Sequence, residues 1–209
     1  MTVLVVGGSG YLGWTTTADG AAHVAAGSIE VGARLVHLSS DALHAGRPEP
    51  YADDEPPTPV HPYGAAKAAA ETAVRLVDPG AVLVRTSAII GDERSKHLQL
   101  CLAALDGDAV LFSDEVRCPV AVDDLAAAVR ELAASDHAGP INVAGPDAVS
   151  RVELGHLVAR RYGVDATRLR STTIAEAGLV RPGEVRLDSA RAVGLLTIRL
   201  RGAVELLTV

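Results

Sequence analysis

The chain has 209 residues and a net charge of -7, and 48% of its residues are hydrophobic while only 3% are aromatic. This length fits one compact domain, or a core domain with a small lobe, whose core is built from Ala, Val, Leu and Ile. The acidic balance argues against a nucleic-acid-binding protein, and no apolar run approaches the ~20 residues that span a bilayer.

Two cysteines, Cys101 and Cys118, are too few for a disulfide framework or a zinc site, so we expect reduced, partly buried thiols. The seven histidines are scattered, and no pair has the spacing of zinc ligands on a helix, so we expect no metal. The first residues lack the basic region of a signal peptide. These features predict a cytoplasmic protein with no membrane partner.

The first predicted element is a buried parallel strand over residues 3–6, a continuous apolar run rich in valine. Gly7, Gly10 and Gly13 follow it directly. A tight glycine turn between a strand and a helix lets the backbone approach a pyrophosphate, which the free N–H groups of the helix start can bind. Alone the signal is weak, because glycine turns without a ligand also occur.

An Ala-rich helix over 18–31 and a strand over 34–38 come next. The strand places Ser39 and Ser40 at its carboxyl end, where open α/β sheets bind their ligands. The proline-rich residues 42–62 predict an irregular loop, and Pro62 opens a helix that runs to Val77.

Strands and helices alternate through the rest of the chain, which predicts a parallel α/β sheet. Asp123 and Asp124 are expected to cap a helix that ends at Ala134, and Ser150 with Glu153 forms a capping box. The remaining strands are predicted over 81–85, 109–112, 118–122 and 141–144, and the remaining helices over 95–105, 151–162 and 188–196.

Tyr63 and Lys67 lie four residues apart and therefore share one face of the predicted helix. A nearby ammonium lowers the pKa of a tyrosine, and a serine hydroxyl such as that of Ser40 can hold a substrate carbonyl against the phenol. In a reduction, hydride from a nicotinamide attacks the carbonyl carbon while the phenol protonates the oxygen. The alternative is a packing tyrosine and a solvated lysine, a common pair on helices.

In this order the motifs resemble the extended short-chain dehydrogenase/reductases, and most of all their dTDP-4-dehydrorhamnose reductase branch. The resemblance covers nearly the whole chain. It implies a Rossmann-like core over 1–145, to which 86–116 partly contributes a substrate lobe, and a C-terminal substrate-binding lobe over 146–209. The matching segments are the glycine turn, 36–41, 62–67 with Glu71, 83–87, 117–126, 142–145 and 181–188.

The resemblance also implies a reductase that uses NADP or NAD on a nucleotide-linked 4-keto-6-deoxy sugar. Its implied catalytic residues are Ser40, Tyr63 as proton donor, and Lys67, with Ser39 as the fallback for Ser40. The substrate would contact Ser40, Asp41, Arg85 and Arg181, although an ordinary loop role for Arg181 is equally open. The cofactor would contact Gly7, Gly10, Tyr11, Leu12, Gly13, Ser39 and Lys67.

The chain departs from this pattern between Gly13 and Ser40, where only 26 residues stand. Because each βαβ unit takes roughly 30 residues or more, about two strand–helix units are missing, with the cut near residues 14–17. The pocket for the adenosine loses a wall, no residue is left to choose between NAD and NADP, and the first strand becomes a sheet edge. A non-catalytic sugar-nucleotide-binding or regulatory protein is therefore the alternative, and a homodimer stays open.

Overall fold

A four-stranded parallel sheet forms the centre of the computed structural model, which describes residues 2–6 and 14–208. The glycine turn with Gly7, Gly10, Tyr11, Leu12 and Gly13 lies outside the described residues. The strand order is β1-β2-β4-β9, and every neighbouring pair is parallel. The predicted shortened, Rossmann-like parallel sheet is confirmed. Its strands are β1 (Val3–Val6), β2 (Arg34–Leu38), β4 (Val82–Thr86) and β9 (Gly139–Val143).

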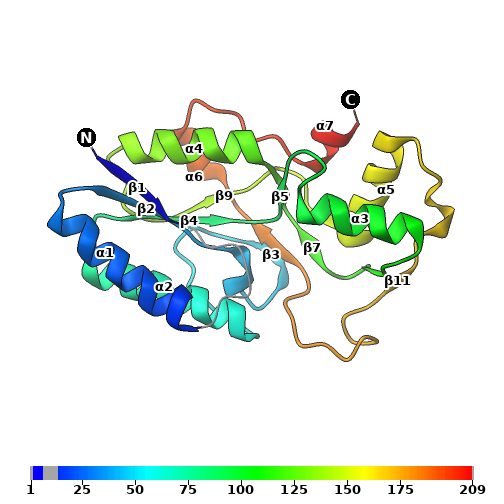
Figure 1. Ribbon diagram of the computed structural model, residues 1–209, viewed down its shortest axis with the longest axis horizontal. Coiled ribbons are helices and arrows are strands. Elements are labelled where there is room, and N and C mark those ends of the chain that lie inside the picture. The colour runs from blue at the N-terminus through cyan, green and yellow to red at the C-terminus, as the bar shows by residue number, and fades with distance from the viewer. Residues whose placement is uncertain (1, 7–13, 209) are drawn as a thin grey trace.

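Helices cover both faces of this sheet (Figure 1). A π-helical turn, η1 (Thr15–Asp19), leads into α1 (Gly20–Glu30), which packs with α2 (Pro62–Val77) on one face. The other face carries α4 (Val122–Ala134). Successive residues of β2 face opposite sides of the sheet: Leu35 packs with α1 and α2, whereas Val36 packs with α4. Small alanine side chains in all three helices allow them to lie close to the strands.

A second hydrophobic cluster lies at the other end of the molecule, where Figure 1 shows α3 and α5 side by side. Leu98 on α3 and Leu154 on α5 are both buried in it. The predicted boundary at 145/146 stays a proposal, because α3 belongs to this cluster while α6 packs with α4. The lobe elements are α3 (Lys96–Asp106), β6 (Leu111–Phe112), β7 (Val116–Arg117), β10 (Val149–Ser150), α5 (Arg151–Tyr162), η3 (Ala166–Arg168), β11 (Ser171–Thr172) and α7 (Ala203–Leu207).

The predicted irregular loop over 42–62 is wrong in part. It contains the 3₁₀ turn η2 (Asp41–Leu43) and the strand β3 (Arg47–Tyr51), which pairs in parallel with β12 (Val185–Leu187). Prolines are tolerated there because β3 belongs to a two-stranded sheet and has a free edge. The partner strand lies far along the chain, so no local pattern reveals the pairing.

The start of α4 also differs from its prediction. Ala121 occupies the N-cap position and makes no side-chain cap bond, while Asp123 and Asp124 lie in the first turn. Asp124 is instead buried in an ion pair with Arg201, whose Nη2 lies 2.7 Å from its Oδ1. The short pair β5 (Ile89–Ile90) and β8 (Val120–Ala121) precedes this helix, and α6 (Ala190–Leu195) follows β12.

Both cysteines are free thiols, and both are buried rather than partly buried as predicted. Over residues 2–6 and 14–208, no helix is long and apolar enough to cross a membrane. The same residues contain no group of three or more His, Cys, Asp or Glu side chains placed to hold a metal ion.

Candidate active site

The carboxyl end of β2 and the first turn of α2 meet at the centre of the candidate site. Ser40 caps η2, since its Oγ accepts from the N–H of Ala42 at 3.2 Å. His61 caps α2, because its Nδ1 accepts from the N–H of Gly64 at 3.0 Å. A Cβ on Gly64 would lie 2.1 Å from the Ala42 carbonyl oxygen. Only glycine therefore allows helix and turn to approach this closely.

The structure brings Ser40, Tyr63 and Lys67 to one cavity wall, as the helical spacing predicts. The Ser40 hydroxyl lies near enough to the Tyr63 phenol to lower the pKa of that phenol. Lys67 is buried, and its Nζ donates to the Leu38 carbonyl oxygen at 3.0 Å. Ser39 lines the same cavity. The catalytic roles themselves stay predictions.

The pKa of Tyr63 differs from expectation. Burial raises the pKa of the phenol; the Ser40 hydroxyl lowers that pKa, and the Asp41 carboxylate raises it further. The predicted lowering by Lys67 is therefore not what this structure shows. Burial also lowers the pKa of the Lys67 ammonium, against an opposing effect of Glu71, and that ammonium bonds a backbone carbonyl. The phenol therefore stays protonated at neutral pH.

Asp41 belongs to a buried polar network that extends across the cavity wall. Its Oδ2 accepts from Ser87 Oγ at 2.5 Å and lies 3.5 Å from Nε of Arg117. Arg117 also donates to the Pro182 carbonyl oxygen at 2.9 Å. Sequence reasoning did not assign Ser87 or Arg117 to the site. The signal available was the arginine placed between apolar residues in a strand segment.

Glu115 gathers three arginines around one buried carboxylate. It lies 2.7 Å from Arg151, 3.3 Å from Arg181 and 3.7 Å from Arg117. Arg151 Nη1 lies 2.9 Å from His97 Nδ1, so that nitrogen accepts and the imidazole is neutral. Burial, and then the charge of Arg151, lowers the pKa of His97 to about 4.

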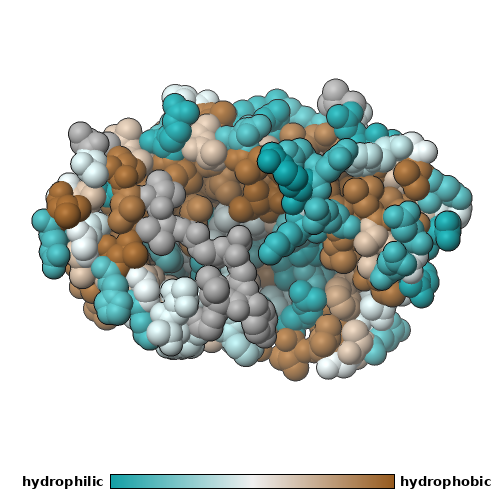
Figure 2. All heavy atoms as spheres, in the orientation of Figure 1, coloured by the Kyte–Doolittle hydropathy of each residue, from teal (hydrophilic) through white to brown (hydrophobic). Residues whose placement is uncertain are grey.

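These groups line one cavity of about 1010 Å³ between the sheet and the lobe. Figure 2 shows hydrophilic side chains gathered in the hollow between the two ends of the molecule. Six basic side chains face two acidic ones, which makes the cavity cationic although the chain is acidic. The acids are Asp41 and Glu115, and the bases are Lys67, Arg94, Lys96, Arg117, Arg151 and Arg181.

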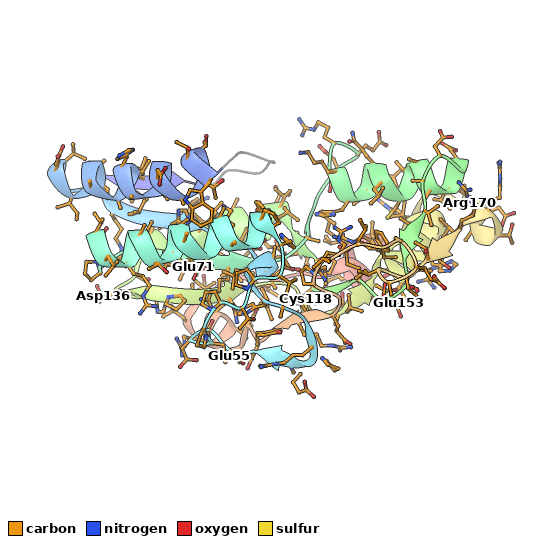
Figure 3. All side chains as sticks on the ribbon, turned by 90° about the horizontal axis from the view of Figure 1, so that it is seen from below. Glu55, Glu71, Cys118, Asp136, Glu153 and Arg170 are labelled. Atoms are coloured by element: carbon orange, nitrogen blue, oxygen red, sulfur yellow. The ribbon has the colours of Figure 1, made fainter. Side chains whose placement is uncertain are left out.

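Arg85 lies apart from the other predicted substrate residues. Its side chain is 2% exposed and is not among the residues that line the cavity. Its Nη2 lies 2.7 Å from Glu71 on α2, and its Nη1 donates to the carbonyl oxygens of Asp53 and Glu55. Figure 3 labels Glu71 on this helix and Glu55 on the loop beneath it. The guanidinium ties that loop to α2, away from the cavity, and its predicted contact with substrate stays a prediction.

The parallel sheet, with Ser40, Tyr63 and Lys67 at its carboxyl edge, defines an extended short-chain dehydrogenase/reductase fold. Residues 15–205 match the family described as "RmlD substrate binding domain", and the chain belongs to that family.

Two curated relatives and one solved structure are similar to this chain. The dTDP-4-dehydrorhamnose reductase of Mycobacterium tuberculosis is 31% identical over 172 residues, covering 78% of this chain and 57% of that protein. The methionine adenosyltransferase 2 subunit beta of Bos taurus is 26% identical over 187 residues, covering 83% of this chain and 55% of that protein. This chain thus spans just over half the length of either relative.

The solved structure is the dTDP-4-dehydrorhamnose reductase of Bacillus anthracis in complex with NADP. It has a TM-score of 0.83 and 22% identity, and the match covers 99% of this chain and 78% of that one. This likeness shows the shared fold.

Proposed function

We propose that this chain is an NADP- or NAD-dependent reductase of a nucleotide-linked 4-keto-6-deoxy sugar, with Tyr63 as the proton donor. The observation that carries the proposal is that Ser40, Tyr63 and buried Lys67 lie together at the wall of a cationic cavity. The reductase from Mycobacterium tuberculosis supports the substrate class.

Two buried hydroxyls in this cavity fit the nicotinamide end of such a cofactor. Among the described residues, Ser39 Oγ and Thr86 Oγ1 are buried without a hydrogen-bond partner, and both residues line the cavity. Buried hydroxyls are normally hydrogen-bonded, so a bound group is a natural partner for them. Together with Lys67, they would hold the cofactor, which supplies the hydride. The Bacillus anthracis reductase, whose structure is a complex with NADP, supports this assignment.

In the proposed reaction, Ser40 and Tyr63 have separate roles at the carbonyl group of the keto sugar. Ser40 orients the carbonyl oxygen by hydrogen bonding, and Tyr63 donates its proton to that oxygen as the C–O bond becomes single. The raised pKa of Tyr63 keeps the phenol in its donating form near neutral pH. Arg151, Arg181 and Lys96 bring positive charge to the lobe side, where a diphosphate would be neutralised.

Titration with NADPH and with NADH, followed by nicotinamide fluorescence, tests the cofactor. We expect saturable binding of at least one of them. The absence of binding of both at the highest concentrations reached would overturn the reductase proposal.

The proton donor is tested with Tyr63→Phe and a dTDP-linked 4-keto-6-deoxy sugar. We expect kcat to fall by roughly 10²–10⁴-fold while cofactor binding is unchanged, because only the phenolic proton is removed. Tyr162→Phe, which changes a half-exposed tyrosine outside this cavity, is the matched control and should retain activity. Wild-type turnover by Tyr63→Phe would refute the role of Tyr63.

A non-catalytic sugar-nucleotide-binding or regulatory role is the second candidate. The described sheet ends at β1, without the further strands of a complete dinucleotide-binding half, and one relative is named as a subunit of another enzyme. Under this alternative, dTDP or a dTDP-sugar binds while NADPH and NADH do not. A cytoplasmic location, like the absence of nucleic-acid and membrane partners, stays a prediction.

A further inference from the structure

The first strand of the sheet is built like a central strand but lies at an edge. Within the described residues, β1 pairs with β2 and with no other strand. Its run of apolar residues is the pattern of a strand covered on both faces. Yet Val3 and Leu4, whose side chains point to opposite faces, are each 37% exposed. Both faces of β1 are therefore incompletely covered.

The backbone of β1 also has a free side. The N–H of Arg34 donates to the Thr2 carbonyl oxygen at 2.8 Å, so Thr2 directs its carbonyl toward β2. Backbone groups alternate along a strand, which directs those of Leu4 toward β2 and those of Val3 and Val5 away from it. A row of unpaired N–H and C=O groups of this kind is a template for another strand.

Further exposed apolar side chains flank this edge. Trp14 is 55% exposed, and at the end of α1 Ile29 and Val31 are 53% and 70% exposed. Figure 2 shows hydrophobic side chains gathered where the β1 end of the sheet opens between its helical layers. Residues 2–6 and 14–18 include no charged side chain. Among the described residues, exposed apolar side chains thus lie near a strand that pairs on one side only, with the exposed Glu30 between Ile29 and Val31.

We propose that two copies of this chain associate through β1, which pairs in antiparallel fashion with its own copy across a two-fold axis. A two-fold axis lets the same surface serve both copies, so each strand satisfies the outward groups of the other. Elsewhere the acidic chains repel one another, whereas residues 2–6 bring no like charges together. The strand has only four residues, so Trp14, Ile29 and Val31 must supply further buried area.

Sedimentation velocity over a wide range of protein concentrations tests this β1-edge dimer. We expect a reversible monomer–dimer equilibrium in the wild-type chain and a monomer for Leu4→Lys, which places like charges at the axis. Leu76→Lys makes the same change at a 79% exposed leucine on α2 and is the matched control, expected to dimerise as the wild type does. Circular dichroism confirms that each variant is folded.

A second variant, Val3→Pro, tests the backbone pairing between the two copies of β1. Val3→Pro removes an N–H that faces away from β2 and should weaken the dimer without breaking the β1–β2 ladder. In the wild type, amide exchange at Val3 and Val5 should slow as concentration rises, while that at Leu4 changes little. A wild-type chain that stays monomeric at all concentrations overturns the proposal. So does a dimer that survives both edge variants, or outward amides that exchange equally fast in monomer and dimer.

Discussion

The buried charged side chains of the site each have a specific ion-pair or hydrogen-bond partner, and the geometry of the site depends on these contacts. Glu115 is surrounded by three arginines, Asp41 accepts from Ser87, and Lys67 donates to the backbone of β2. Removing one member of such a pair leaves an uncompensated charge in a medium that solvates it poorly. These side chains therefore contribute to stability as well as to the chemistry of the cavity.

The Arg85–Glu71 pair offers a test at this scale. Glu71→Ala leaves the buried Arg85 without its carboxylate, and we expect a loss of about 3–5 kcal/mol in the free energy of unfolding, measured by urea denaturation. The control is Asp92→Ala, which breaks the exposed Arg94–Asp92 pair and should leave the unfolding midpoint unchanged. Equal losses of stability from the two substitutions would contradict a stabilising role of the buried Arg85–Glu71 pair.

At the scale of elements, the close approach of α2 to η2 decides whether Tyr63 reaches Ser40. Gly64 makes that approach possible, because the Ala42 carbonyl oxygen occupies the space of a Cβ. Pro62 at the start of α2 and the His61 cap then fix where the helix begins. The tyrosine is thus positioned by its neighbours in the chain, and the serine by the end of β2.

Gly64→Ala tests this contact against a matched glycine. We expect it to destabilise the fold by about 1–3 kcal/mol, and to lower turnover further by separating Tyr63 from Ser40. Gly27→Ala on α1 has open space around the added methyl group and should stabilise by up to about 1 kcal/mol. Thermal melting and the proposed reductase assay measure both. Gly64→Ala behaving like Gly27→Ala would refute the argument.

At the scale of the whole molecule, three imidazoles in different layers are neutral: His37 and His44 are buried, and His97 is partly buried. Burial, and then Lys67, lowers the pKa of His37 in β2 to about 4. Burial, and then Arg85, lowers the pKa of His44 beside β3 to about 4. His97 in the lobe has the same lowered pKa. The histidine side chains in the sheet, the loop and the lobe therefore all resist protonation.

The sign of the resulting pH dependence follows from these values. An unfolded histidine binds a proton near its ordinary pKa of about 6.5, whereas the folded ones bind it only near 4. Their contribution to stability is therefore complete above pH ~6.5 and decreases as the pH falls toward 4. Urea midpoints should be constant from neutral to mildly alkaline pH and fall steeply in acid.

His44→Phe isolates one of the three groups. It keeps an aromatic ring against Tyr51 while removing two ring nitrogens that have no hydrogen-bond partner among the described residues. Between pH 7 and 5, the unfolding free energy of this variant should change less than that of the wild type. An unchanged acid dependence would show that His44 does not contribute to it.

The sequence by itself determined several of the main elements and the side chains that share a face within them. The strands at 3–6 and 34–38, the helix opened by Pro62 and the Ser150–Glu153 capping box are all present as predicted. Each depends on periodicity or on a cap within a few residues. The same holds for Tyr63 and Lys67, whose shared face follows from one helical turn.

Only the tertiary structure decided which distant side chains meet. It paired β3 with β12, turned Arg85 toward Glu71, and gathered Arg151 and His97, 54 residues apart, at the Glu115 carboxylate. It also determined the raised pKa of Tyr63, which depends on burial and on Ser40 and Asp41, both of which lie outside the helix that carries the tyrosine. Local patterns carry no record of such contacts, because they arise when the sheet and the lobe close around a common cavity.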